Sequence, residues 1–156
     1  MKRNRISFFI SISLSIIIAV IIFWFSSQNG TTSGGISRGI TRELFPGVLD
    51  DKIVLAIEGL LRKAAHYMIY FILGISVYFS YVYYMSAFTA KEPLIRDKVF
   101  IPTLICFVYS VTDELHQYFV PDRNGTFLDC VLDTIGALSG VLIVIAVIAL
   151  MKKRKN

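Results

Sequence analysis

The stretch that decides the fold spans Tyr109 to Gly140 and reads YSVTDELHQYFVPDRNGTFLDCVLDTIGALSG. It contains the end of one apolar segment, a turn, and the start of a second apolar segment. Its polar and charged residues include Asp113, Glu114, His116, Gln117, Arg123, Asp129 and Asp133. An ionisable side chain at the centre of a membrane-spanning helix costs about 2.5–3.5 kcal/mol on insertion scales. Because the flanking residues are apolar enough to span a membrane, this concentration of charge requires a structural or functional reason.

The composition indicates a membrane protein that crosses the bilayer several times. Of the 156 residues, 55% are hydrophobic and 17% are charged, and the charged residues gather between long apolar runs. A soluble domain of this length is more polar. We therefore expect an all-α fold, with one bundle over residues 1–156. The net charge of +5 does not point to nucleic acid, because the basic residues flank apolar segments.

Four apolar runs are long enough to span a membrane. They predict helices over residues 6–25, 64–85, 99–119 and 127–151. The first run ends in Phe23-Trp24-Phe25 and lacks the cleavage site of a signal peptide, so we expect an uncleaved span with an interfacial anchor. Small residues recur in it every four positions, which predicts close contact with another helix. These residues are Ser7, Ser11, Ser15 and Ala19.

The segment between the first two spans has two parts. Residues 26–47 are rich in Ser, Thr, Gly and Asn, which is typical of a loop. In residues 48–61, apolar side chains such as Ile53 and Leu60 recur at helical spacing, and charged residues fall mostly off that stripe. This second part is too short and too charged to span a bilayer. It predicts an extracellular amphipathic helix lying on the membrane.

The distribution of basic residues predicts the orientation. Four spans place both termini on the same side. The basic blocks at the N-terminus, in residues 86–98 and in residues 152–155 then all face the cytoplasm, and the short loop 118–126 faces outward. This agrees with the excess of Lys and Arg in cytoplasmic loops.

With that topology, polar groups from three spans meet at one depth. From a helical rise of about 1.5 Å per residue, His66 lies about 4 Å inside the outer end of its span. Asp113, Glu114 and Asp133 lie about 8–9 Å inside the outer ends of theirs. Arg123, on the loop above, can reach down to a carboxylate. We therefore expect a polar pocket that opens to the outer leaflet.

Several of these residues also have a purely structural interpretation. Thr126 and Asp129 fit the capping-box spacing at the start of a helix. Lys63 suits an interfacial lysine whose ammonium group reaches the membrane surface. His66 can be a packing histidine, and Arg123 can form an ion pair with a carboxylate that only fixes the bundle. The convergence of three acidic residues argues against these structural interpretations, because fixing the bundle does not require so many acids.

The small and sulfur-containing residues have mainly structural interpretations. Gly136 and Gly140 form a GxxxG pattern, which predicts close helix contact and allows a homo-oligomer. Cys106 and Cys130 fall at different depths of their spans, so we expect no disulfide between them.

Two motifs resemble the VanZ family of small bacterial membrane proteins. The first is Lys63-x-x-His66-x-x-x-Tyr70, with Gly74 following. The second is Asp113-Glu114-x-x-Gln117-x-Phe119-x-Pro121-x-Arg123, then Asp129, Gly136 and Gly140. The resemblance covers about residues 6–150. Two positions depart from the family pattern, because Asp122 stands where the family usually has Gly and Asp133 where it usually has Asn.

The resemblance implies a four-span protein in the cell membrane of Gram-positive-type bacteria. The namesake of the family is associated with low-level resistance to the glycopeptide antibiotic teicoplanin. Many relatives have no resistance context, so resistance can be one consequence of a broader function in the cell envelope.

The first functional hypothesis is a protein that binds or modifies an amphiphile in the outer leaflet. The candidates are a membrane lipid, a lipid-linked cell-wall precursor and a lipoglycopeptide. Lys63 and Arg123 would hold phosphate or carboxylate groups. The full set of expected ligand-binding residues is Lys63, Tyr70, Gln117, Arg123, Asp129 and Asp133.

The second hypothesis is a membrane hydrolase or transferase with His66, Asp113 and Glu114 as catalytic residues, because adjacent carboxylates below the surface suit general acid–base work. A divalent ion held by these residues and Asp133 would support hydrolysis of an ester or phosphoester bond. No His-Glu-x-x-His or Gly-x-Ser-x-Gly motif is present, so the sequence assigns no metal and no cofactor. The third hypothesis is a structural partner protein in which the acids only lock the helices together.

Overall fold

The computed structural model describes residues 2–28, 51–89, 91–121, 123 and 125–154, together with positions 35, 39 and 43. The described residues contain no strand, which confirms the all-α fold. Four helices are long and apolar enough to cross a membrane. The elements are α1 (Lys2–Ser26), α3 (Asp51–Tyr84) with a π-helical turn at Met85–Thr89, α4 (Ile95–Tyr118) and α5 (Phe127–Lys153).

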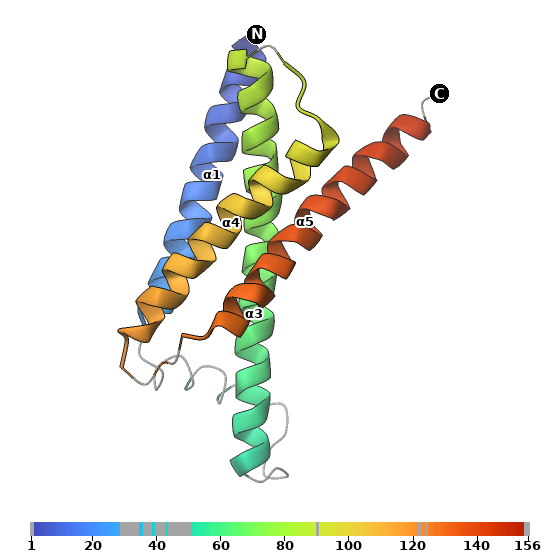
Figure 1. The fold of residues 1–156 in the computed structure, drawn as a ribbon. Helices are drawn as coiled ribbons and strands as arrows, with labels where there is room; N and C mark the ends of the chain where they lie inside the picture. Colours follow the sequence, from blue (N-terminus) through green and yellow to red (C-terminus); the bar gives the residue numbers. More distant parts are fainter. Residues whose placement is uncertain are drawn as a thin grey trace.

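Helix α3 is the centre of the bundle and contacts α1, α4 and α5. Figure 1 shows α4 and α5 crossing α3 obliquely and both chain termini at the same end of the molecule. The core lies where the four helices meet and includes Ile22, Tyr70, Cys106 and Ala137. Most apolar side chains of the outer helix faces remain exposed, as expected for surfaces that contact lipid.

Small residues allow α1 and α3 to approach closely. Ser15 Oγ lies 2.9 Å from Ser76 Oγ and 3.2 Å from Ser80 Oγ, and both partners belong to α3. Ser76 Oγ also donates to the backbone carbonyl of Ser11 at 3.2 Å. The predicted role of the serine stripe in helix contact is therefore confirmed, and hydrogen bonds across the contact reinforce it.

Glycines likewise allow α3 and α5 to approach each other closely. A Cβ atom on Gly136 would collide with the backbone carbonyl of Tyr67, and one on Gly140 with that of Phe71. In the opposite direction, Gly74 of α3 packs against the backbone of α5. Gly136 and Gly140 thus serve a contact within the chain. A homo-oligomer stays a prediction, but it would need a surface other than these two glycines.

The prediction of a separate amphipathic helix over residues 48–61 is wrong for the residues from 51 onward. This stretch is the beginning of α3, which continues without a break into the second span; positions 48–50 lie outside the described residues. Its 34 residues make a helix about 51 Å long, against a hydrocarbon thickness of about 30 Å. Figure 1 shows the start of α3 extending beyond the ends of α4 and α5. The charged residues taken as a boundary, Arg62 and Lys63, are good helix formers and do not interrupt it.

Cys106 and Cys130 are both free and buried, which confirms that they form no disulfide.

Candidate functional site

The polar residues of α4 lie on one helix face that points into the bundle. Ser110, Asp113, Glu114 and Gln117 follow the i, i+3, i+4, i+7 spacing of one helix face, and all four are buried. The intervening Leu115 is exposed. This inside-out pattern, with the polar stripe inward and the apolar surface outward, is typical of a helix that faces lipid.

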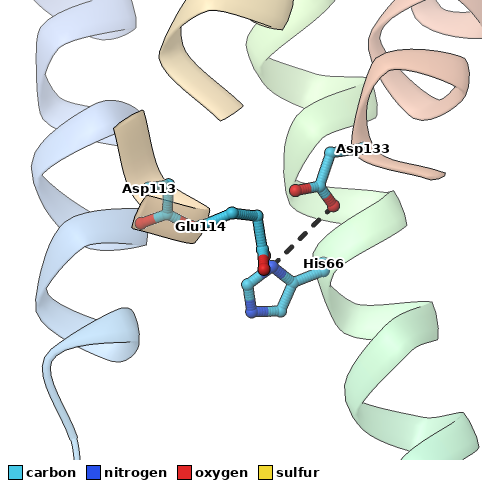
Figure 2. Close-up of side chains that lie close together, drawn as sticks. All are labelled: His66, Asp113, Glu114 and Asp133. Atoms are coloured by element: carbon cyan, nitrogen blue, oxygen red, sulfur yellow. Dashed lines mark ion pairs between the residues drawn. The ribbon is translucent and has the colours of Figure 1, made fainter. Parts of the chain in front are cut away.

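Three helices bring one imidazole and three carboxylates together. His66 comes from α3, Asp113 and Glu114 come from α4, and Asp133 comes from α5 (Figure 2). One possible ligand atom from each of the four residues lies within 4.8 Å of the others. His66 Nδ1 is 3.8 Å from Asp133 Oδ1. The sequence-based expectation that these groups share one depth agrees with this arrangement.

The two aspartates are almost completely buried, and only one carboxylate oxygen of each accepts a hydrogen bond. Asp113 is 2% exposed, and its Oδ2 accepts hydrogen bonds from Ser26 Oγ at 2.9 Å and Gln117 Nε2 at 3.1 Å. Asp133 is 0% exposed, and its Oδ2 accepts a hydrogen bond from Ser110 Oγ at 2.9 Å. The Oδ1 atom of each residue is buried without a hydrogen-bond partner. Such atoms are uncommon in folded proteins.

Glu114 is held from two sides. Its Oε1 accepts from Gln117 Nε2 at 3.1 Å, and its Oε2 accepts from the backbone N–H of Thr126 at 3.0 Å. The Gln117 amide oxygen in turn accepts from Arg62 Nη2 at 3.2 Å. Gln117 therefore links two carboxylates to the polar extension of α3.

The start of α5 closes the outer edge of the site. Thr126 caps the helix by accepting from the backbone N–H of Asp129, and it also donates to the Asp129 carboxylate at 2.7 Å. Only the Thr126 half of the predicted capping box is formed, because the backbone N–H of Thr126 donates to Glu114 and not to Asp129. The Asp129 carboxylate also accepts from Lys63 Nζ at 2.8 Å. Lys63 is thus already paired, although 54% of its side chain remains exposed.

Arg123 does not form the expected ion pair with Asp113 or Glu114. It is buried, and its Nη2 donates to the backbone carbonyl of Phe25 at 2.9 Å, at the end of α1. The turn between α4 and α5 directs the side chain toward α1, a geometry that residue spacing alone does not give. Burial lowers the pKa of Arg123 to about 10, so the guanidinium stays charged at neutral pH.

A polar cavity of about 250 Å³ lies beside the cluster, between the N-terminal half of α3 and the facing ends of α4 and α5. The expected site residues that line it are Lys63, His66, Glu114, Gln117, Asp129 and Asp133. Asp113, Tyr70 and Arg123 do not line it.

Residues 9–150 of the chain match the model of the VanZ/LLP1 family. The chain belongs to the VanZ/LLP1 family. Comparisons with curated proteins and with solved structures found no match.

In this VanZ/LLP1 protein, Tyr70 belongs to the core rather than to the cavity. It is 0% exposed, its hydroxyl has no hydrogen-bond partner, and its ring lies 6.1 Å from that of Tyr109 between centroids. The second histidine, His116, lies outside the cluster. Its ring stacks on Phe23, and its Nε2 is 3.1 Å from Ser27 Oγ.

Sequence reasoning missed Arg62. It lines the cavity and donates to Gln117, yet it stood at the expected boundary between a surface helix and a span. A signal was present, because Arg62, His66 and Tyr70 are spaced four residues apart and share one helix face. Ser26 and Ser110, which hold the two aspartates, were missed as well, since serines in apolar helices carry little signal of their own.

The geometry of this VanZ/LLP1 site supports two kinds of chemistry. Arg62 and Lys63 at the cavity edge suit recognition of an anionic group. His66 and Glu114 face the same cavity, and both residue types can transfer protons.

Proposed function

We propose that this VanZ/LLP1 protein binds the anionic head group of an envelope amphiphile, with Arg62 and Lys63 as the recognising cations. The observation that supports this most is the polar cavity with both cations at its edge. Its volume of about 250 Å³ suits a phosphate or a small head group, and it lies just below the usual range of about 300–1,000 Å³.

Arg62 is the better placed of the two cations. One of its N–H groups donates to Gln117. An arginine has five N–H donors in a planar fork, which matches two oxygens of a phosphate or carboxylate. Lys63 shares its ammonium group with Asp129 and adds charge at the rim. Arg123, expected from the sequence to hold the ligand, has no place in this proposal because it does not line the cavity.

The proposal includes an orientation and a class of ligand. Both termini lie in the cytoplasm of a bacterial cell, so that the cavity opens at the outer leaflet. Membrane lipids, lipid-linked cell-wall precursors and lipoglycopeptides all combine an anionic or polar head with a long apolar chain. Binding such a precursor, or an acylated glycopeptide directly, would give the low-level resistance to teicoplanin associated with the namesake of the family.

A hydrolase or transferase is the second candidate, supported by His66 and Glu114 facing one cavity. In hydrolysis of a bound phosphoester, Glu114 would take a proton from water as the oxygen attacks phosphorus. His66 would donate a proton to the leaving oxygen as its bond to phosphorus breaks. Asp113 does not line the cavity, so its expected catalytic role changes to positioning Gln117.

Native mass spectrometry of the protein in lipid nanodiscs tests the proposal. The nanodiscs contain phosphatidylcholine with either phosphatidylglycerol or a polyprenyl phosphate, and EDTA is present throughout. We expect wild type to retain the anionic lipid at least tenfold more than Arg62→Gln. The matched control is Arg96→Gln, because Arg96 is an exposed arginine outside the cavity, at the start of α4. Equal retention by wild type and Arg62→Gln would contradict the proposal.

A second series of spectra, recorded over time without EDTA, separates binding from turnover. A binding protein returns the lipid at its intact mass, whereas a hydrolase accumulates the cleaved product over time. Under the enzymatic candidate, Glu114→Gln retains the intact lipid and forms no product. Product formation by Glu114→Gln at the wild-type rate would exclude Glu114 as the proton acceptor.

A further inference from the structure

We propose that His66, Asp113, Glu114 and Asp133 form a binding site for one divalent first-row transition-metal ion, with Zn²⁺ and Mn²⁺ as the best candidates. The four side chains supply one imidazole nitrogen and three carboxylate groups from three different helices (Figure 2).

The spacing of the donors suits one ion. All four ligand atoms lie within 4.8 Å of one another. With bonds of about 2.1 Å, opposite donors of a six-coordinate ion are about 4.2 Å apart and donors of a tetrahedral ion about 3.4 Å apart, so the side chains would close by up to about 0.6–1.4 Å around the ion.

The unpartnered aspartate oxygens are an independent indication of a ligand. Asp133 Oδ1 is fully buried, points toward His66 in Figure 2, and has no hydrogen bond. Asp113 Oδ1 is also buried without a partner. At 3.8 Å the contact from His66 Nδ1 to Asp133 Oδ1 is too long for a hydrogen bond. An ion between these groups would give each of these atoms a partner.

The charge balance leads to the same conclusion. Within the described part of the chain, no Lys or Arg forms an ion pair with any of the three carboxylates, and His66 is their one ion-pair partner, through Asp133. Carboxylates this close repel one another strongly where water is excluded. A divalent cation offsets that repulsion without needing another side chain.

Hydrogen bonds from outside the cluster fix the carboxylates in place. Ser110 holds Asp133 through Oδ2, and Ser26 and Gln117 hold Asp113 through Oδ2. In Asp133 the held Oδ2 leaves Oδ1 pointing toward His66 (Figure 2). Metal-ligating carboxylates usually have such supporting bonds, which orient them before the ion binds.

The donor set narrows the choice of ion. Ca²⁺ and Mg²⁺ prefer sites made of oxygen alone, whereas an imidazole favours first-row transition ions. A set of one nitrogen and three carboxylates is suitable for Zn²⁺ and Mn²⁺. The ion would be accessible from the cavity, because His66, Glu114 and Asp133 line it.

Metal content of the purified full-length protein tests the inference. The protein is stripped with EDTA, exposed separately to Zn²⁺, Mn²⁺ and Ca²⁺, desalted, and analysed by inductively coupled plasma mass spectrometry. We expect about one Zn²⁺ or Mn²⁺ per chain in wild type, no retained Ca²⁺, and affinity at least tenfold weaker in His66→Gln and Asp133→Asn.

The matched controls are His116→Gln and Asp97→Asn, which remove the same chemical groups outside the cluster and should bind like wild type. Size-exclusion profiles and helical circular dichroism verify that each variant folds. If a variant does not fold, thermal denaturation of wild type with and without the ion replaces it, and we expect a higher midpoint with Zn²⁺ or Mn²⁺. Less than one ion per ten chains in wild type, or full binding by His66→Gln, would overturn the inference.

This inference does not depend on the proposed amphiphile binding. Lipid retention is measured in EDTA and depends on Arg62. Metal content is measured without added anionic lipid and depends on His66 and Asp133. Either result can fail while the other holds.

Discussion

At the scale of single residues, Gln117 is the side chain on which the buried polar network depends most. It donates to Asp113 and Glu114 and accepts from Arg62, and it is 1% exposed. Its Nε2 also donates to Ser26 Oγ at 3.3 Å, so Gln117→Leu keeps a similar volume but removes four hydrogen bonds. A buried polar group left without its partner costs about 1–3 kcal/mol. We expect this variant to lose about 2–4 kcal/mol of stability, measured as a lower midpoint in thermal denaturation in detergent.

Gln28→Leu is the control for that measurement. The Gln28 side chain makes no hydrogen bond within the described residues, and the residue lies two positions after the end of α1, outside the site. We expect its midpoint to stay near that of wild type. If the two variants had the same midpoint, the network around Gln117 would not contribute to stability.

Part of this site follows from residue spacing and part does not. Helical rise places His66, Asp113, Glu114 and Asp133 at similar depths, because depth in a helix depends only on position. It gives no information about a turn, and the contact of Arg123 with α1 is decided by the turn before α5. The unpartnered oxygens of the aspartates likewise appear only when three helices are placed together.

At the scale of helices, a Gly→Ala substitution should have opposite effects on stability at two positions. Gly140→Ala places a methyl group against the backbone of Phe71 in α3, so α5 must move away. Such overpacking costs about 1–3 kcal/mol. Gly59→Ala meets nothing within 4 Å, and alanine is better in a helix by about 0.5–1 kcal/mol.

Thermal denaturation of both variants and of wild type measures the change in stability that each substitution causes. We expect a lower midpoint for Gly140→Ala and an equal or slightly higher one for Gly59→Ala. A Gly140→Ala protein as stable as wild type would show that α3 and α5 do not need the close approach of their backbones.

The existence of four apolar helices is predictable from hydropathy, but the continuity of α3 is not. The mean hydropathy of a sliding window falls where charged residues begin. A hydropathy profile therefore divides residues 51–84 near Lys63. Helix continuity depends on a different property, the absence of Pro or a turn sequence, and no such breaker stands between Asp51 and Tyr84. Considering breakers before hydropathy would have placed Arg62 on the same helix as His66.

At the scale of the whole molecule, the two ends of the bundle differ in charge. The end with both termini also holds the start of α4, so the basic residues at 96, 98 and 152–154 gather there with those at the start of α1 (Figure 1). The polar cavity lies toward the opposite end, where α3 begins. Because loops rich in Lys and Arg stay in the cytoplasm, this asymmetry predicts which end faces outward.

Labelling of single introduced cysteines in intact cells tests that orientation. Leu60 is 68% exposed in the outer part of α3, and Met151 is 57% exposed near the end of α5. We expect a membrane-impermeant maleimide to label Leu60→Cys in intact cells, and Met151→Cys only after permeabilisation. The unmodified chain is the control, since Cys106 and Cys130 are 0% and 4% exposed and should react little. Labelling of Met151→Cys in intact cells, with Leu60→Cys protected, would place the cavity at the cytoplasmic face. An outer-leaflet amphiphile could not then be its ligand, whereas the metal site, which depends only on distances within the bundle, would be unaffected.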